Sequence, residues 1–343
     1  MSEAIFHGHH DVQVNRHATA WRGFVIAIAV ATALPFIVAP LTEQVIPQGT
    51  PGFMLFAVIN FLGGNVHVAT TGWFYSDPEM RAHFRSRPIR YVVVPLMLIF
   101  GTGAAFATLN QIVLAYGVIA YTGWLLWHYQ KQNVGVASFI AAGTDGPSLS
   151  PWERRTLILA SLPGILGVFN VTHGTGTGWV AETMRQLHSV GLMTYALVAI
   201  AFCLAMITTP ALRINRLRLL SLISGALFFV PTYLFSNPIA AISGYTIAHG
   251  LQYLVFMGVV CIDRRKVGAA LLRLLLFALP VGLVLDKVMY TPDWLSSRYG
   301  MIANGVVFGL VMSHFVLDAG IWRLREPFQR AYMRRKFAFV FER

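Results

Sequence analysis

Long apolar segments separated by short polar ones are the feature that most constrains the fold of this chain. A helix needs about 20 mostly apolar residues to cross the hydrocarbon core of a bilayer. Ten stretches meet this requirement, at roughly 22–41, 52–75, 90–109, 111–130, 154–172, 188–209, 217–236, 239–262, 267–287 and 300–322. Only 12% of the residues are charged, against about 25% in a typical soluble domain. The sequence therefore predicts an all-α fold, a polytopic transmembrane helical bundle of about ten spans.

The basic residues predict the orientation of this bundle. If the N-terminus is cytoplasmic, 23 of the 26 Lys and Arg residues fall in cytoplasmic segments, and only Arg185, Lys287 and Arg298 fall outside. An excess of Lys and Arg in cytoplasmic loops is the general rule for membrane proteins. We therefore expect both termini to be cytoplasmic and the protein to lie in a bacterial-type inner membrane. The same rule accounts for the net charge of +12 without a nucleic-acid partner.

Three parts follow along the chain. Residues 1–20 are predicted to form a cytoplasmic tail that contains histidines, and residues 21–323 to form the transmembrane domain. Residues 324–343 mix Arg and Lys with Phe, a composition typical of a segment that contacts membrane lipids at the cytoplasmic surface. The two cysteines lie in apolar segments without a CxxC motif, so neither a disulfide framework nor a thiolate metal site is expected.

Four histidines are predicted to lie at overlapping depths in the bilayer. His67, His128, His249 and His314 fall on the second, fourth, eighth and tenth predicted spans, which all cross in the same direction. A single intramembrane histidine can simply link helices by hydrogen bonds. Four at similar depth favour a shared site instead. Because neutral imidazole is a good ligand for iron, copper and zinc, we predict that these four side chains hold a metal ion.

Polar residues accompany the histidines at helical spacing. Asp318 lies four residues after His314 and so shares its helix face, where an ionisable pair is costly and marks a functional site. His67 belongs to a polar stripe with Asn60, Gly64 and Thr71. A metal-bound imidazole usually donates its other N–H to a carboxylate, amide or carbonyl. The residues expected to support the histidines in this way are Asn60, Gln132, Gln252 and Asp318, and the candidate catalytic residues are Asp318 and Tyr253.

Two further histidines flank a predicted outer loop. His173 and His188 lie on either side of a Gly-Thr run. This segment is interpreted as a flexible loop, with a cap over an entrance or a second metal site as alternatives.

The ligand types narrow the chemistry. Asp318 is the only acidic residue clearly inside a predicted span, so a histidine-dominated, mononuclear site fits better than a carboxylate-bridged pair of ions. The HxxxH and HxxHH motifs of membrane desaturases and hydroxylases are absent. A metal within the bilayer implies a lipophilic substrate, and iron with an open position implies dioxygen.

We therefore predict a metal-dependent oxygenase or oxidase with iron as the cofactor. Copper and zinc also suit the ligands, whereas haem fits less well because the histidines are not placed at two clear depths. The alternatives are a proton-coupled transporter, with His314 and Asp318 as a relay, and a haem-binding electron carrier. The sequence does not indicate a protein partner.

The arrangement resembles polytopic bacterial carotenoid 15,15′-dioxygenases of the Brp/Blh type, which carry single histidines on several spans and a late His-x3/4-Asp element. Here that element is His314-Phe315-Val316-Leu317-Asp318. The resemblance implies that His67, His128, His249 and His314 bind iron and that a polyene is cleaved. The Pro-His-Gly element and paired histidines of that family are absent, and Ala248-His249-Gly250 is the nearest equivalent.

Overall fold

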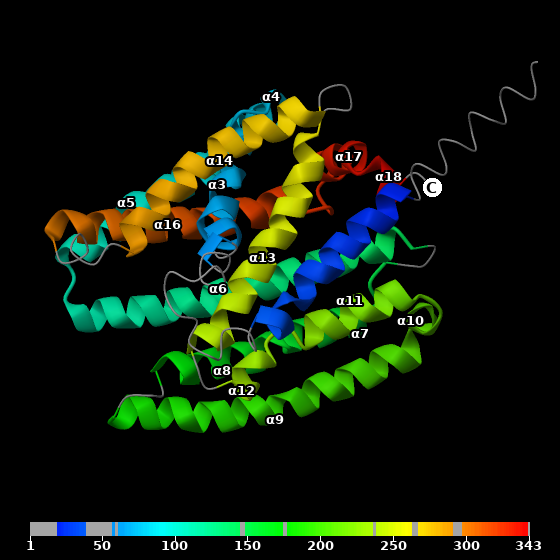
Figure 1. Cartoon of the computed structure of the whole chain (residues 1–343), viewed down its shortest axis with the longest axis horizontal. Helices are drawn as coiled ribbons and strands as arrows, with labels where there is room; N and C mark the ends of the chain where they lie inside the picture. The colour runs from blue at the N-terminus through cyan, green and yellow to red at the C-terminus, as the bar shows by residue number, and fades with distance from the viewer. Residues whose placement is uncertain are drawn as a thin grey trace, which may run out of the picture. The chain divides into compact units, whose positions relative to one another are not determined.

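The computed structural model describes residues 19–38, 57–58, 61–144, 148–173, 177–235, 238–262, 267–290 and 297–341. Within these ranges all regular secondary structure is helical, as the sequence predicts (Figure 1). The chain divides into two compact units. The first unit comprises residues 1–43, 130–245 and 324–343, and the second comprises residues 44–129 and 246–323.

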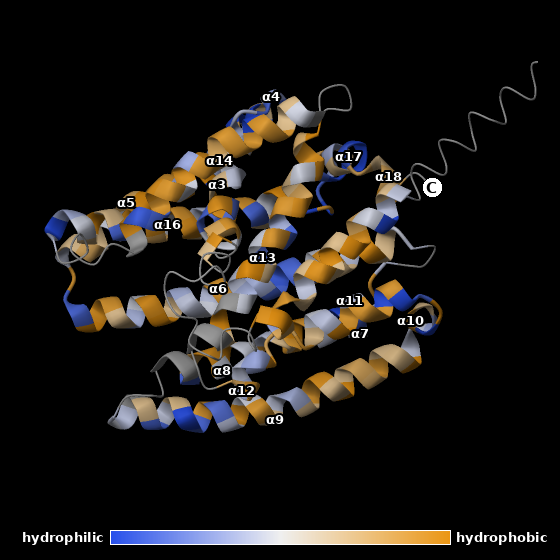
Figure 2. Ribbon diagram, in the orientation of Figure 1, coloured by the Kyte–Doolittle hydropathy of each residue, from blue (hydrophilic) through white to orange (hydrophobic). Residues whose placement is uncertain are grey.

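Seven helices in the described part of the chain are long and apolar enough to cross a membrane. They are Thr19–Val38, Ile89–Thr108, Gln111–Ala142, Ala181–Thr208, Gly244–Cys261, Gly268–Val288 and Arg298–Ile321. Several of them expose large apolar side chains, for example Leu276 and Val284 on α14 (Val267–Tyr290), which are 65% and 62% exposed. Figure 2 shows hydrophobic residues along α14 and hydrophilic ones gathered in α4 (Pro78–Ser86) and α17 (Pro327–Lys336). Exposed apolar helix faces of this extent are suited to lipid, so the chain has the character of an integral membrane protein.

Two of the ten predicted spans are interrupted helices. The segment 154–172 is divided at Ala160 between α7 (Pro151–Leu159) and α8 (Ser161–His173). The segment 217–236 is divided between α11 (Arg216–Ala226) and α12 (Pro231–Leu234). Proline explains both breaks, because Pro163 and Pro231 have no N–H to donate to the carbonyl four residues earlier.

A third predicted span, 52–75, is described mainly from residue 61 onwards. It changes from a π-helix, η1 (Leu62–Val66), to one turn of α-helix, α3 (His67–Thr70), and then to a 3₁₀ helix, η2 (Thr71–Tyr75). Short π and 3₁₀ stretches are often found at functional positions. The irregular geometry surrounds His67 and Thr71.

The fourth predicted span is too short at its C-terminal end. α6 (Gln111–Ala142) continues for 32 residues, whereas the sequence suggested an end near residue 130. Polar residues such as Lys131 and Gln132 are typical of a loop. No proline follows until Pro147, however, so no proline interrupts the helix before its end at Ala142. At 1.5 Å per residue α6 is about 48 Å long. His128 therefore lies well inside a continuous helix.

In the second unit, α5 (Val94–Thr108) and α16 (Arg298–Ile321) lie side by side (Figure 1). Gly305 and Gly309 face α5, where a Cβ on Gly309 would lie 2.5 Å from the Cα of Ile99. Small residues four apart allow two membrane helices to approach this closely. Ser313 donates to the carbonyls of Gly309 and Pro95, at 2.7 and 3.1 Å. The contact holds α16 in a defined register.

A closer contact joins η1 to α13 (Pro238–Cys261). A Cβ on Gly250 would lie 1.8 Å from the carbonyl oxygen of Gly63, and one on Gly63 would lie 2.6 Å from the Cα of Ile247. The two backbones are in direct contact, so only glycine fits. Gly282 of α14 packs on Val66 in the same region.

In the first unit a buried ion pair joins α7 to α11. The guanidinium of Arg218 donates to both carboxylate oxygens of Glu153 at 2.7 Å, and Nη2 also donates to the Ser148 carbonyl at 3.1 Å. Glu153 also forms a capping box with Ser150. Burial by itself would raise the pKa of Glu153, but the hydrogen bonds and charge of Arg218, together with Ser150, hold that pKa below its usual value.

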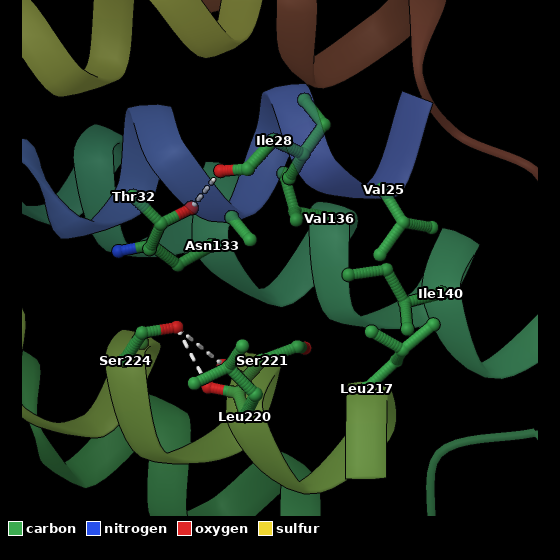
Figure 3. A pocket seen from close by; sticks show the side chains of 12 residues that line it. Val25, Ile28, Thr32, Asn133, Val136, Ile140, Leu217, Leu220, Ser221 and Ser224 are labelled. Atoms are coloured by element: carbon green, nitrogen blue, oxygen red, sulfur yellow. Dashed lines mark hydrogen bonds between the residues drawn. The ribbon is translucent and has the colours of Figure 1, made fainter. Parts of the chain in front are cut away.

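Two other features complete this unit. Phe337, between α17 and α18 (Ala338–Phe341), packs on Phe24 and Phe139 with ring centroids 5.9 and 5.1 Å apart. A crevice among helix Thr19–Val38, α6 and α11 is lined mostly by apolar side chains (Figure 3). The hydroxyls of Thr32 and Ser224, which also line it, donate to their own helix backbones.

Replacing Gly250 should disrupt the second unit. We expect Gly250→Ala to destabilise the protein by more than about 3 kcal/mol, since overlap with a backbone is harder to relieve than ordinary overpacking. Thermal unfolding in detergent measures the change. Gly258→Ala on the same helix is the matched control, because its Cβ would meet nothing within 4 Å. Equal melting temperatures for the two variants would contradict the assigned contact.

Removing one partner of the buried ion pair should destabilise the first unit. We expect Glu153→Gln to cost about 3–5 kcal/mol, because it leaves the guanidinium of Arg218 buried without a counter-charge. The double variant Glu153→Gln/Arg218→Met should recover part of the loss. Glu182→Gln, which removes an exposed pair with Arg185, should change stability little.

The same pair predicts a pH dependence. Because the pKa of Glu153 is lowered in the folded state, its contribution is present above the unfolded value of about 4.3. It should be lost as the pH falls through the folded pKa. Thermal melts of the wild type and of the double variant, recorded between neutral and acidic pH, measure this contribution. As the pH falls, the wild type should lose more stability than the double variant.

Candidate metal centre

The four predicted histidines converge in the second unit from four different helices. His67 begins α3, while His128, His249 and His314 lie on α6, α13 and α16. Neighbouring ring centroids are 4.8 Å apart for His67 and His249, 4.9 Å for His249 and His128, 5.1 Å for His128 and His314, and 5.1 Å for His314 and His67. All four side chains are buried. We call these four residues the histidine cluster.

The possible ligand atoms fall into two groups that share His314. One atom each from His67, His249 and His314 lie within 4.8 Å of one another, and so do atoms from His128, His314 and Asp318. Oδ2 of Asp318 is 3.8 Å from Nε2 of His128 and 3.6 Å from Nε2 of His314. Ligands about 2.0–2.2 Å from a tetrahedral ion are themselves about 3.4 Å apart. Small movements of these side chains would therefore accommodate an ion.

Three ring nitrogens of the cluster are buried without a hydrogen-bond partner among the described residues. They are Nδ1 of His67 and Nε2 of His128 and His314. An unsatisfied buried polar atom costs about 1–3 kcal/mol. A metal ion would bind these lone pairs directly, so the donor set fits an ion.

A chain of hydrogen bonds links the remaining nitrogen of His314 to Asp318. Nδ1 of His314 lies 2.7 Å from Oγ1 of Thr71, and that oxygen lies 2.8 Å from the hydroxyl of Tyr253. Tyr253 in turn donates to Oδ1 of Asp318 at 2.9 Å. One carboxylate oxygen is thus held by Tyr253, while the other faces the histidine cluster.

Aromatic rings hold the imidazoles in place. Phe315 stacks on His128 with centroids 4.4 Å apart, and Tyr129 stacks on His249 at 4.3 Å. On the Asp318 side, Trp322 contacts Tyr253 and Phe256, at 6.2 and 5.4 Å. These contacts restrict the rings to few orientations, which suits a preformed binding site.

The helices bring these side chains together for identifiable reasons. The contact of Gly63 with Gly250 sets the distance between η1 and α13. His67 comes directly after η1, and His249 lies next to Gly250 on α13, so this contact also brings the two imidazoles together. On α16, His314 and Asp318 share a face because they are four residues apart. The register of α16 on α5 is maintained by Gly305, Gly309 and Ser313.

Not every predicted supporting residue joins the cluster. Asn60 lies outside the described residues. Gln132 belongs to the first unit. Gln252 is buried three residues after His249, and Tyr253 and Asp318 lie beside the histidines. His173 and His188 both belong to the first unit, where the ring of His188 lies 4.7 Å from that of Tyr233.

Thr71 is a supporting residue that the sequence does not single out. It belongs to the polar stripe of His67, four residues further along, but a hydroxyl is a less common partner for a metal-bound imidazole than a carboxylate, amide or carbonyl. Spacing alone could have placed it on the correct face. Its contact with His314 depends on the packing of two distant segments.

Comparison with protein-family models, curated proteins and solved structures found no match to this chain.

Substituting any member of the histidine cluster by alanine should lower the metal content of the protein. We expect His67→Ala, His128→Ala, His249→Ala and His314→Ala each to purify with much less metal than the wild type, because each loses one ligand. Elemental analysis of protein purified in detergent measures this. His188→Ala, outside the cluster, is the control and should keep the wild-type content. Equal metal content in all five variants would contradict the assignment.

Proposed function

We propose that the protein is a membrane-embedded, histidine-ligated and iron-dependent oxygenase or oxidase that acts on a lipophilic substrate. The observation that supports this most directly is the buried cluster of four histidines and one aspartate, in which three ring nitrogens have no hydrogen-bond partner among the described residues. A purely structural cluster would use those atoms to link the helices. Their arrangement favours a bound ion instead.

The donor set is the reason for preferring a redox metal. Four imidazoles and one carboxylate suit iron, and copper or zinc could also bind them. Bound iron would supply the dioxygen chemistry in this proposal.

The protein's own residues have distinct roles in this scheme. The histidine cluster holds the ion, and Asp318 either ligates it through Oδ2 or orients His128 and His314. Tyr253 holds a proton at its hydroxyl, 2.9 Å from Oδ1 of Asp318. It is therefore the candidate for delivering a proton beside the ion.

The surroundings support a substrate taken from the bilayer. The ligands lie on α6, α13 and α16, which include candidate spans, and on the segment of irregular helix that contains His67. Apolar and aromatic side chains such as Phe315, Trp124 and Val311 surround them. A polyene, as in the carotenoid-cleaving family that the sequence resembles, is the substrate we propose to test first. We also propose that both termini are cytoplasmic and that the protein lies in a bacterial inner membrane.

A proton-coupled transporter is the second candidate, and one observation favours it. The hydrogen bonds from His314 through Thr71 and Tyr253 to Asp318 form a continuous path that could carry a proton. A haem carrier has less support. The four imidazoles contact one another with centroids 4.8–6.2 Å apart, which suits an ion better than a porphyrin.

Oxygen consumption tests the proposed function. We expect protein in lipid nanodiscs, reconstituted with Fe²⁺, to consume dioxygen when a carotenoid or another long apolar alkene is supplied. The rate should fall at least about 100-fold in His314→Ala, which loses a ligand shared by both groups. The control His188→Ala should keep the wild-type rate. Protein that binds no metal and instead carries out pH-dependent flux in proteoliposomes would favour the transporter.

A further inference from the structure

We propose that Thr71 and Tyr253 form a hydroxyl bridge that fixes His314 in a single tautomer and ring orientation and thereby sets the metal affinity of the site. The inference rests on the proposed function only in requiring that the histidine cluster binds an ion. It assigns a positioning role to Thr71, which is neither a ligand nor an ionisable residue.

The bridge joins three separate segments. Thr71 begins η2, Tyr253 lies on α13, and His314 and Asp318 lie on α16. Its three distances are 2.7, 2.8 and 2.9 Å. All four side chains are buried, so no solvent competes for these bonds. The bridge closes a loop, because His314 and Asp318 also approach each other directly, with Nε2 and Oδ2 3.6 Å apart.

The direction of each hydrogen bond follows from the number of protons available. Tyr253 donates its one proton to Oδ1 of Asp318, at 2.9 Å. The Tyr253 oxygen must then accept the proton of the Thr71 hydroxyl. With its proton committed, the Thr71 oxygen can only accept from Nδ1–H of His314.

This order of donors determines which nitrogen of His314 can bind metal. A proton on Nδ1 leaves the lone pair of the neutral ring on Nε2. Nε2 is buried, has no hydrogen-bond partner in the described part of the chain, and faces Asp318. The bridge thus presents the ligand nitrogen toward the cluster in one tautomer.

Thr71 differs in this respect from other helical threonines of the protein. A threonine in a helix commonly donates its hydroxyl to the carbonyl three or four residues earlier. Thr102 and Thr122 do so, to Leu98 and Val118 at 2.6 and 2.9 Å, and Thr70 does so to His67 at 2.6 Å. The hydroxyl of Thr71 contacts two side chains from distant segments instead.

The local helix geometry places Thr71 for this role. The chain changes from α-helix to 3₁₀ helix at Thr71, one turn after His67. A 3₁₀ turn is tighter and rotates side chains by a different angle per residue. One irregular segment therefore supplies both a candidate ligand, His67, and the hydroxyl that orients another, His314.

The test compares hydroxyl removal with hydroxyl retention at one position. Thr71→Val keeps the branched shape and removes the hydroxyl, while Thr71→Ser keeps the hydroxyl. The full-length protein in detergent is titrated with Co²⁺ against a competing chelator, and the visible spectrum of Co²⁺ reports its coordination. We expect Thr71→Val to weaken Co²⁺ binding about 10–100-fold, as for other residues that orient a ligand. Thr71→Ser should stay close to the wild type.

Two further variants keep the test decisive. Thr102→Val removes a hydroxyl that donates to the carbonyls of Leu98 and Ile99 in its own helix, and should leave Co²⁺ affinity unchanged. Tyr253→Phe removes the link between Thr71 and Asp318 and should also weaken binding and alter the Co²⁺ spectrum. This variant carries the test if Thr71→Val fails to fold.

The outcomes separate this inference from the proposed function. Thr71→Val protein that binds Co²⁺ as tightly as the wild type would overturn the hydroxyl bridge but not the metal site. If Thr71→Val does not fold, the same result in Tyr253→Phe would overturn the bridge. Equal weakening in Thr71→Ser and Thr71→Val would also overturn it, since the hydroxyl would not be the cause. A wild-type protein that binds neither Co²⁺ nor Fe²⁺ would instead overturn the proposed function.

Discussion

The contact between Gly63 and Gly250 is the constraint on which the candidate site depends. A Cβ added at Gly250 would overlap the carbonyl oxygen of Gly63, so the backbones of η1 and α13 are in direct contact. His67 lies one turn beyond Gly63, and His249 lies next to Gly250. The two imidazoles can therefore contact each other without long side chains to reach across a gap. Any larger residue at this crossing would separate the ligands together with the helices.

The buried polar side chains of the two units differ in their hydrogen-bond partners. In the first, Arg218 donates two hydrogen bonds to Glu153 and one to the Ser148 carbonyl, and Glu153 also accepts from the backbone N–H of Ser150. This pair joins α7 to α11. In the second, the histidine cluster has ring nitrogens with lone pairs that no described group uses. The first arrangement joins two helices, while the second has the donor atoms that the proposed metal ion would use.

The hydroxyl bridge links the packing of the helices to the proposed metal site. A metal site needs its ligands held before the ion arrives, because orienting them afterwards would weaken binding. Stacking by Phe315 and Tyr129 restrains two of the imidazoles, and the bridge restrains a third. The bridge also connects the candidate ligand His314 with the candidate proton donor Tyr253. Metal binding and proton delivery would then share one network.

The sequence by itself determined the class of the protein and the residue types of the site. Apolar segment length predicted membrane helices, because backbone groups in lipid must bond within their own segment. The depth of His67, His128, His249 and His314 predicted a shared site, since helix position translates directly into depth. Segment length and depth are local properties of the chain and do not depend on which helices are neighbours.

The breaks in two predicted spans follow from Pro163 and Pro231, which are local features of the sequence because each lacks an N–H. Tertiary structure decided the partners of each imidazole. The role of Thr71 depends on the packing of η2 against α13 and α16, and no spacing in the sequence encodes a contact 243 residues away. Depth could be predicted from the sequence, but rotation about each helix axis, and therefore which side chains meet, is decided only by packing.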